Sequence, residues 1–195
     1  YIYFASGENR QRLSQLPQLE KLTEKGFDVL LMTDEVDSFV PQTLGKYADK
    51  DFRSVTQEDL GLSTDEEKKE AAEQAEKSKA TLEFVKTTLG DAVKEVRLSD
   101  NLGTHPVCMV PEEGMTFEME KYFKAAQPEL GLKAKRILEI NVDHPAFLAF
   151  EAARLTDPER AKKYAEIFYN QAQLIAGLPI DDPTAYTDLL CSLWQ

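Results

Sequence analysis

The sequence predicts a small α/β subdomain followed by an α+β domain that ends in helices. In residues 1–55, short apolar segments typical of strands alternate with amphipathic helical segments, an order that favours some parallel strand pairing. After residue 62 a charged helical segment precedes the strand-like segments, and helical segments dominate the end. A break at residues 61–65 separates the two patterns, so we expect domains at 1–62 and 63–195.

The first domain contains three predicted strands and two predicted helices. Residues 1–5 are aromatic and β-favouring, residues 27–32 form an apolar run typical of a strand buried on both faces, and residues 52–55 fit one more strand. Residues 17–25 combine leucines with charges and end at Gly26, which indicates a helix and its closing glycine. A second helix, capped by Asp34, carries Phe39, although Pro41 is unfavourable in its interior.

The second domain begins with a charged helix and continues with strands. Residues 66–89 are rich in Glu, Lys, Ala and Gln, and only their second half has an apolar stripe, so we expect the first half to be solvated. Strands are predicted at 93–98, 106–110 and 136–140. Helices are predicted at 117–126, capped by Thr116, and at 145–155, opened by Pro145.

Two helices joined by a short turn are predicted for the end of the chain. Asp157-Pro158 and Asp182-Pro183 are helix starts, and Gly177 closes the first helix because glycine adopts the left-handed conformation without steric cost. The last helix is about three turns long, which is too short to persist alone in water, so its apolar face needs cover. We expect a second copy of the chain to cover it; the alternative is that both helices fold back on their own domain.

The composition argues against several classes of function. The formal charge of −12 at pH 7 argues against binding to nucleic acid and to anionic membrane surfaces. No apolar run approaches the roughly 18 residues that a membrane span needs. Cys108 and Cys191 fit no disulfide framework, which favours a reducing, cytoplasmic location. The chain starts inside an apparent strand without a methionine, so we expect a fragment of a longer protein.

The sequence offers no candidate catalytic residue and no metal site. His105 and His144 each precede a proline and have no second histidine at ligand spacing, so we expect both to cap or pack near turns. Asp34, Glu35 and Asp37 gather at a helix start, which the helix dipole alone explains. A carboxylate hydrolase that uses Asp34 and Asp37 is the weakest of the functions that fit the sequence.

The 117–126 helix has a face of methionine and aromatic residues. Met115, Met119, Tyr122 and Phe123 fall on one side, and methionine suits a surface that accepts varied partners. From spacing alone, an ordinary core-facing stripe is the favoured interpretation. Phe117 falls off this stripe and, if exposed, would enlarge an apolar patch.

Short sequence blocks, in the same order along nearly the whole chain, carry a family resemblance. They are Tyr1-Ile2-Tyr3 with Ser6-Gly7-Glu8, Lys25-Gly26-Phe27-Asp28-Val29-Leu30, Asp34-Glu35-Val36-Asp37, Val96-Arg97-Leu98-Ser99, Met115-Thr116-Phe117-Glu118-Met119-Glu120, Leu138-Glu139-Ile140-Asn141 with Asp143-His144-Pro145, and Asp182-Pro183. The first three resemble the end of the middle domain of the ninety-kilodalton heat-shock protein chaperones. The others resemble the C-terminal domain of that family, most closely its bacterial branch of the high-temperature protein G type.

The resemblance implies a homodimeric, ATP-driven chaperone that takes part in the heat-shock response and binds unfolded or partly folded client proteins. It implies that residues 1–62 are the end of the middle domain. Residues 63–195 would be a C-terminal dimerisation domain whose last helices form an intermolecular four-helix bundle. The family's nucleotide site and catalytic arginine would lie outside this chain. On that basis the chain is expected not to be an enzyme and to have no cofactor, with ATP and Mg²⁺ bound by the full-length parent.

The resemblance also implies which residues contact partners. The residues expected to contact clients are Met115, Phe117, Met119, Tyr122, Phe123 and Phe39. The residues expected at the dimer interface are Tyr164, Ile167, Phe168, Gln171, Leu174, Ile175, Tyr186, Leu189, Leu190, Leu193 and Trp194.

The end of the chain bears on partners as well. It reads Leu193-Trp194-Gln195, without the acidic tail of cytosolic eukaryotic family members, so we expect no tetratricopeptide co-chaperone to dock there. The alternative function is a stand-alone acidic adaptor module that binds one folded partner.

Overall fold

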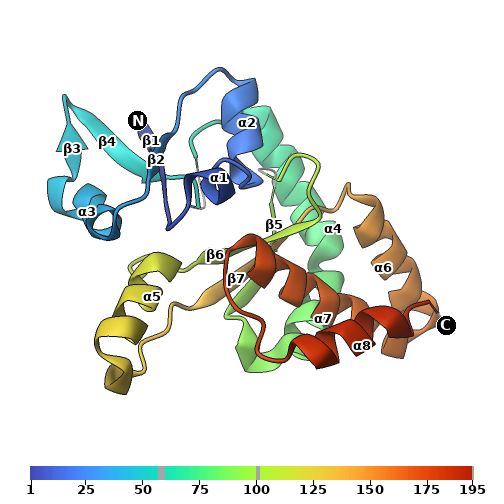
Figure 1. Ribbon diagram of the computed structural model, residues 1–195. Coiled ribbons are helices and arrows are strands. Elements are labelled where there is room, and N and C mark those ends of the chain that lie inside the picture. The colour runs from blue at the N-terminus through green and yellow to red at the C-terminus, as the bar shows by residue number, and fades with distance from the viewer. Residues whose placement is uncertain (57–59, 100–101, 195) are drawn as a thin grey trace. The chain divides into compact units, whose positions relative to one another are not determined.

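The computed structural model describes residues 1–56, 60–99 and 102–194, which form two compact units (Figure 1). Unit 1 comprises residues 1–63 and 111–135, and unit 2 comprises residues 64–110 and 136–195. One border between the units therefore falls beside the domain boundary expected at residue 62, whereas residues 111–135 group with the N-terminal segment. Gln195 lies outside the described residues.

Unit 1 is built on a mixed sheet in the order β2-β1-β4-β3. The central strand β1 pairs in parallel with β2 and with β4, whereas β3 and β4 are antiparallel. Its core includes Tyr3, Leu22 and Val55, and the hydroxyl of Tyr3 donates a buried 2.7 Å hydrogen bond to the carbonyl oxygen of Leu60. The elements of unit 1 are β1 (Ile2–Ser6), α1 (Arg10–Leu13), α2 (Gln18–Glu24), β2 (Leu30–Met32), η1 (Glu35–Ser38), α3 (Val40–Leu44), β3 (Lys46–Tyr47), β4 (Lys50–Ser54), α5 (Phe117–Ala126) and η3 (Pro128–Leu130).

The strand expected at residues 27–32 is shorter and more exposed than its apolar sequence predicts. Only Leu30–Met32 is strand, and none of its three residues is buried. The prediction of burial on both faces is therefore wrong, and β2 lies at the edge of the sheet, with β1 as its strand neighbour.

The single helix expected from Asp34 onwards is two short helices. The 3₁₀ helix η1 ends at Ser38, and α3 begins at Val40 with Pro41 in its first turn. Proline has no N–H to donate and is tolerated at a helix start, so the helix restarts at this point instead of continuing. As a result Phe39 lies at the junction, where it is half-buried.

A tight hairpin connects β3 and β4 at a position that the sequence does not signal. Tyr47 pairs with Lys50, and the two residues between them, Ala48 and Asp49, have φ values of 46° and 62°. Two successive positive φ angles are typical of the hairpin turn that follows the twist of its strands, for which Asn-Gly is the usual sequence.

The segment 111–135 is closed at its base by paired contacts within unit 1. The backbone N–H of Glu112 donates to the carbonyl oxygen of Lys135 at 2.9 Å, and the two side chains form an ion pair at 2.9 Å. Further along, the buried carboxylate of Glu120 accepts a 2.7 Å hydrogen bond from the backbone N–H of Ala134. These contacts fix the position of α5, whose start is capped by Thr116.

Unit 2 combines a three-stranded sheet, in the order β5-β7-β6, with four helices of ten residues or more among its described residues. β5 and β7 are parallel and pair Arg97 with Glu139. The helices α4, α6 and α7 pack together, and α8 packs on α7. The elements are α4 (Asp65–Leu89), η2 (Gly90–Ala92), β5 (Glu95–Leu98), β6 (Val107–Pro111), β7 (Arg136–Ile140), α6 (Pro145–Thr156), α7 (Pro158–Ile175) and α8 (Pro183–Ser192).

The described helices include none that is both long and apolar enough to cross a membrane.

Candidate functional site

The helix α7 has one face inside unit 2 and another that remains accessible. Its start is capped by Asp157, whose carboxylate accepts the N–H of Arg160 at 3.1 Å. Ala161, Ala165 and Ala172 are fully buried, and Phe168 packs against Phe150 with the ring centroids 5.8 Å apart. The apolar stripe that the sequence shows on this helix is therefore mostly a core stripe.

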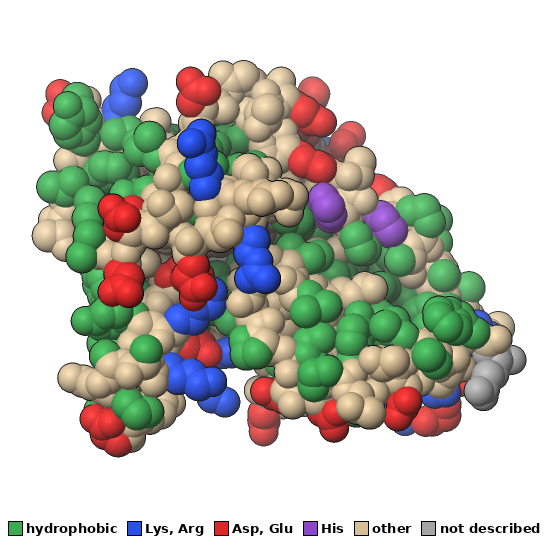
Figure 2. Space-filling model, in the orientation of Figure 1, with side chains coloured by type: hydrophobic (Ala, Val, Ile, Leu, Met, Phe, Trp, Pro, Cys, Tyr) green, Lys and Arg blue, Asp and Glu red, His purple; other side chains and the backbone are tan. Residues whose placement is uncertain are grey.

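The helix α8 is covered far less. Asp182 caps it by accepting the N–H groups of Thr184 and Ala185, yet none of its residues is buried. Trp194, just beyond the helix, is 83 % exposed, and Leu174 on α7 is 52 % exposed. Figure 2 shows hydrophobic side chains gathered over α7 and α8 on the face of the molecule that it presents.

The expected dimer-interface residues fall into two groups. Ile167 and Phe168 are buried inside unit 2 and do not face a second chain, so this part of the expectation is corrected. They lie on the side of α7 that packs within the unit, which spacing alone does not separate from the accessible side. The accessible interface residues are Tyr164, Gln171, Leu174, Ile175, Tyr186, Leu189, Leu190, Leu193 and Trp194, half-buried or exposed.

Polar contacts attach α8 to α7. Burial raises the pKa of Tyr186 above its ordinary value, and a side-chain hydrogen bond with Gln171 acts in the opposite direction. The guanidinium of Arg160 donates to the carbonyl oxygen of Leu193 at 3.3 Å. These contacts set the direction of α8 and leave its leucines only partly covered.

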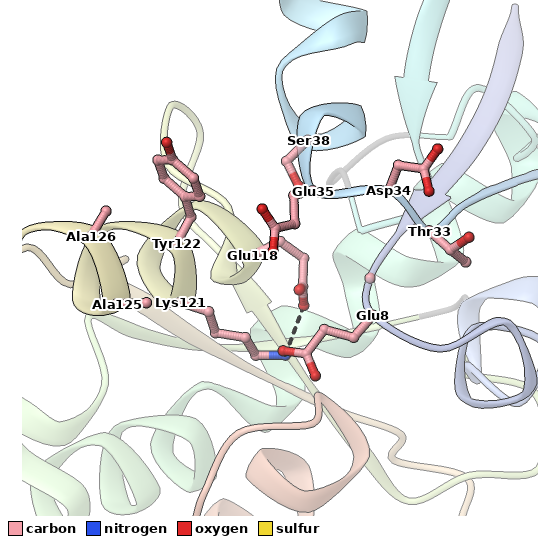
Figure 3. A pocket seen from close by; sticks show the side chains of 11 residues that line it. Glu8, Thr33, Asp34, Glu35, Ser38, Glu118, Lys121, Tyr122, Ala125 and Ala126 are labelled. Atoms are coloured by element: carbon pink, nitrogen blue, oxygen red, sulfur yellow. Dashed lines mark hydrogen bonds and ion pairs between the residues drawn. The ribbon is translucent and has the colours of Figure 1, made fainter.

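In unit 1 some of the residues expected to contact clients pack together, and one of them, Tyr122, lines an open cleft (Figure 3). Phe39 packs edge to face against Tyr122 with ring centroids 5.6 Å apart, and Tyr122 packs against Phe123 at 5.7 Å. The side-chain amide of Gln42 lies 3.9 Å from the sulfur of Met119. The structure thus brings together two segments that are far apart in the sequence.

Not all of these expected client residues are accessible. Phe117 is 7 % and Met119 is 5 % exposed, so both belong to the packed side of α5 and the expectation that they offer contact surface is corrected. Phe117 is buried although it falls off the main stripe. Tyr122 is 44 % exposed, and Met115, Phe123 and Phe39 are half-buried. We call Phe39, Tyr122 and Phe123 the aromatic cluster.

The cleft next to the aromatic cluster has a volume of about 430 Å³ and an acidic lining. Glu8, Asp34, Glu35 and Glu118 contribute carboxylates, whereas Lys121 is the cation of the lining among the described residues. The ammonium of Lys121 lies 2.9 Å from Glu118 and 3.8 Å from Glu8. Sequence reasoning missed this cleft, because its acids come from three separate segments and show no common spacing.

The acids at the start of η1 have a local structural role. Asp34 and Asp37 form a capping box, in which the N–H of Asp34 donates to Asp37 at 2.9 Å. The sequence also favoured a structural role over a carboxylate hydrolase, but it explained the acids by the helix dipole and not by a capping box. His144 likewise caps α6, because its Nδ1 accepts the N–H of Ala146 at 3.1 Å, which confirms its expected role.

Comparison with known proteins connects the chain to one family. The model of the family described as Hsp90 protein matches residues 1–195. The chaperone protein HtpG of Clostridium acetobutylicum is 42 % identical over 195 residues, which are 100 % of this chain and 31 % of the relative. The HtpG proteins of Bacillus subtilis and Halalkalibacterium halodurans are 40 % and 41 % identical over 193 residues, 99 % of this chain and 31 % of each relative. The chain thus spans less than a third of the length of these relatives.

These matches contradict two expectations: that the chain is not an enzyme, and that it has no cofactor of its own. Both separated the chain from the ATP chemistry of its family, whereas the family model matches all of residues 1–195. Neither exclusion is therefore kept.

The cleft of unit 1 does not fit these groups. Proteins hold polyphosphates with backbone N–H groups, helix N-termini and lysines, and the cleft instead presents Glu8, Glu35 and Glu118, with Lys121 already paired. Among the described residues, His, Cys, Asp and Glu side chains form no group of three or more that could hold a metal ion. The lining of this cleft is therefore unsuited to ATP and to Mg²⁺.

Proposed function

The chain belongs to the Hsp90 protein family, and on this premise we propose that it joins two copies of a cytoplasmic, ATP-dependent chaperone and forms part of the surface that holds unfolded clients. In the family resemblance this role belongs to the end of the middle domain and to the C-terminal domain. The proposed joint is a four-helix bundle made by α7 and α8 of two copies.

The observation that carries the proposal is the incomplete cover of α8. A ten-residue helix gains too little from its own hydrogen bonds to persist in water and depends on packing of its apolar face. Leu189, Leu190 and Leu193 are only partly covered by α7, and Trp194 is almost fully exposed. A contiguous apolar surface of this kind is typical of a contact between proteins.

Joining two copies has a mechanistic consequence for an ATP-dependent chaperone. Once two chains are tied at one end, encounters between their other parts become intramolecular, with an effective concentration that reaches the millimolar range for short connections. The acidic surface suits a protein that meets many polypeptides in solution, because a net charge of −12 opposes nonspecific association of the chaperone with itself.

The aromatic cluster of unit 1 is the proposed client contact. It offers the partly exposed ring of Tyr122 beside the half-buried rings of Phe39 and Phe123. Incompletely folded chains expose apolar side chains, and aromatic residues bind such side chains with a large contact area at low cost in side-chain entropy.

Light scattering after size exclusion tests the joint directly. We expect the mass of two chains at micromolar concentration, and the mass of one chain after truncation behind Pro179, which removes α8. Truncation behind Leu155 is unsuitable, because it also removes Phe168 and the buried alanines from the core of unit 2. A matched pair of point variants avoids truncation: Leu190→Ser with Trp194→Ser should separate the copies, and Asp188→Ser, an exposed polar change on the same helix, should not.

If the unaltered protein has the mass of one chain, the proposal that two copies are joined is wrong. A tight, selective complex with one folded protein, without retention of unfolded chains, would instead favour the alternative of an acidic adaptor.

A further inference from the structure

The acidic cleft of unit 1 lies directly beside the aromatic cluster, and the two together define a binding preference. We propose that they bind extended polypeptide segments in which lysine or arginine side chains alternate with large apolar ones. The inference rests on the proposed client contact and names the chemical class of segment that this contact selects.

The size and form of the cleft suit such a segment. Its volume of about 430 Å³ falls within the roughly 300–1,000 Å³ typical of ligand sites. Glu8 follows β1, Glu35 and Ser38 lie on η1, and Tyr122 with Ala125 and Ala126 lies on α5, so three elements surround the space (Figure 3).

The cleft keeps a net negative charge even when the ion pair between Lys121 and Glu118 is counted. Lys121 forms its close ion pair with Glu118 and lies farther from Glu8. Glu35 is exposed and lines the cleft, and its carboxylate has no hydrogen-bond or ion-pair partner among the described residues. A segment that covers the cleft removes water from these carboxylates, which is costly unless the segment brings a cation or hydrogen-bond donors. An acidic segment is repelled, and a purely apolar one leaves Glu35 without compensation.

The aromatic wall of the cleft favours the same occupant. The ring of Tyr122 lines the cleft, and an aromatic face attracts the ammonium of lysine or the guanidinium of arginine. Val36 follows Glu35 in η1 and is 65 % exposed, although it does not line the cleft. The apolar residues of the segment therefore have Tyr122, Ala125 and Ala126 to contact, while its cation reaches Glu35 and Glu8.

Fluorescence anisotropy with three labelled peptides tests this preference on the whole 195-residue chain. In the basic probe, lysines alternate with leucines; in the neutral and acidic probes, glutamines and glutamates replace the lysines. We expect the basic probe to bind most tightly. Its affinity should fall about two- to fivefold with Glu35→Gln, and about tenfold with Glu35→Lys, as expected for partly exposed ion pairs.

A matched control lies in the same unit. Glu113 is an exposed acid in the turn before α5 and does not line the cleft, so Glu113→Gln should leave the affinity for the basic probe unchanged. Raising the salt concentration from about 0.1 M to about 1 M shortens the Debye length from about 10 Å to about 3 Å, and it should weaken the basic probe alone. Glu35 is exposed, so circular dichroism should show a folded protein for both of its variants.

The outcomes separate this inference from the proposed function. Equal binding of all three probes, or binding of the basic probe that Glu35→Lys leaves unchanged, overturns the inference and leaves the client contact in place. Failure of every probe, and of an unfolded protein, to bind overturns the client contact itself. If Glu35→Lys changes the oligomeric mass, the acidic cleft is a contact between copies of the chain, and the inference is also wrong.

Discussion

The ring of Phe168 lies edge to face against the ring of Phe150, with centroids 5.8 Å apart and planes at 67°. Phe150 is fully buried, and it also contacts Phe84 and Phe147, so one aromatic residue joins α4, α6 and α7. This cluster holds the inner side of α7, and it leaves the outer side free for other contacts.

The first prediction compares the two sides of α7. Phe168→Ala should reduce the free energy of unfolding by about 3–5 kcal/mol, because it leaves a cavity in the core. Leu174→Ala, at a position 52 % exposed, should change the stability of the single chain by less than about 0.5 kcal/mol but lower the affinity between copies. Urea denaturation and light scattering measure the two effects. Equal destabilisation by both variants would contradict the assignment of the faces.

The second prediction concerns the ion pair between neighbouring strands of unit 2. Nε and Nη2 of Arg97 donate to one oxygen of Glu139 at 3.0 and 2.8 Å, and the thiol of Cys108 donates to the other oxygen at 3.3 Å. Glu139→Gln leaves the charge of Arg97 poorly compensated in a largely buried site and should cost about 3–5 kcal/mol. Replacing both Arg97 and Glu139 by leucine should cost much less, as chemical denaturation would show.

The third prediction is a pH dependence. The hydrogen bonds from Arg154 lower the pKa of Glu151 from its ordinary 4.5, burial opposes this effect, and the hydroxyl of Thr81 adds to the lowering. The folded state therefore favours the ionised carboxylate, so its contribution is present above the ordinary pKa and is lost as the pH falls through the lowered pKa. Because both side chains keep partial access to solvent, the contribution should not exceed about 1 kcal/mol.

Thermal unfolding at two pH values measures this contribution. Glu151→Gln should lower the Tm at about pH 7, and the difference from the unaltered chain should shrink at about pH 3. Glu83→Gln, which changes an exposed acid on α4, serves as the control and should give the same Tm difference at both pH values.

The fourth prediction concerns the residue that holds α5 in place. Glu120→Ala leaves the buried N–H of Ala134 without its acceptor and should cost about 1–3 kcal/mol. Glu120→Gln keeps an acceptor at the same place and should recover most of that loss. Hydrogen exchange at Ala134 provides the local measurement: exchange should accelerate in the alanine variant and stay slow in the glutamine variant.

The fifth prediction separates packing from client contact on α5. Met119→Ser should destabilise unit 1 by about 2–4 kcal/mol, because Met119 is buried. Phe123→Ser should reduce retention of an unfolded client with a smaller effect on stability, and Lys124→Ser should change neither. Suppression of aggregation of a heat-denatured protein provides the readout. Loss of stability with Phe123→Ser, equal to that with Met119→Ser, would support an ordinary core stripe.

Local signals predicted many elements closely. The Asp-Pro starts and Gly177 predicted α7 and α8 almost to the residue, because caps act through adjacent backbone groups. The ranges of α5 and β7 were predicted for a similar reason: their patterns begin and end at clear signals. The three-residue length and exposure of β2 were not predicted, since a strand's place at a sheet edge depends on which segments pair with it.

The candidate sites were predicted less completely. Spacing identified the apolar faces of α5 and α7, but it did not distinguish buried from exposed residues on them. Met119 and Phe168 are buried, whereas Tyr122 and Leu174 are exposed. Which side of a helix is covered depends on distant partners, such as Phe150 for α7 and Gln42 for α5. The cleft acids were not predicted because Glu8, Glu35 and Glu118 meet only in three dimensions.

The contacts between Glu112 and Lys135 have an evolutionary consequence. The hydrogen bond and the ion pair hold the two ends of the segment between Glu112 and Lys135 close together. The interior of this segment can therefore gain or lose residues while its two ends stay fixed. We expect insertions and deletions within residues 127–133 to be tolerated more readily than changes at Glu112 or Lys135.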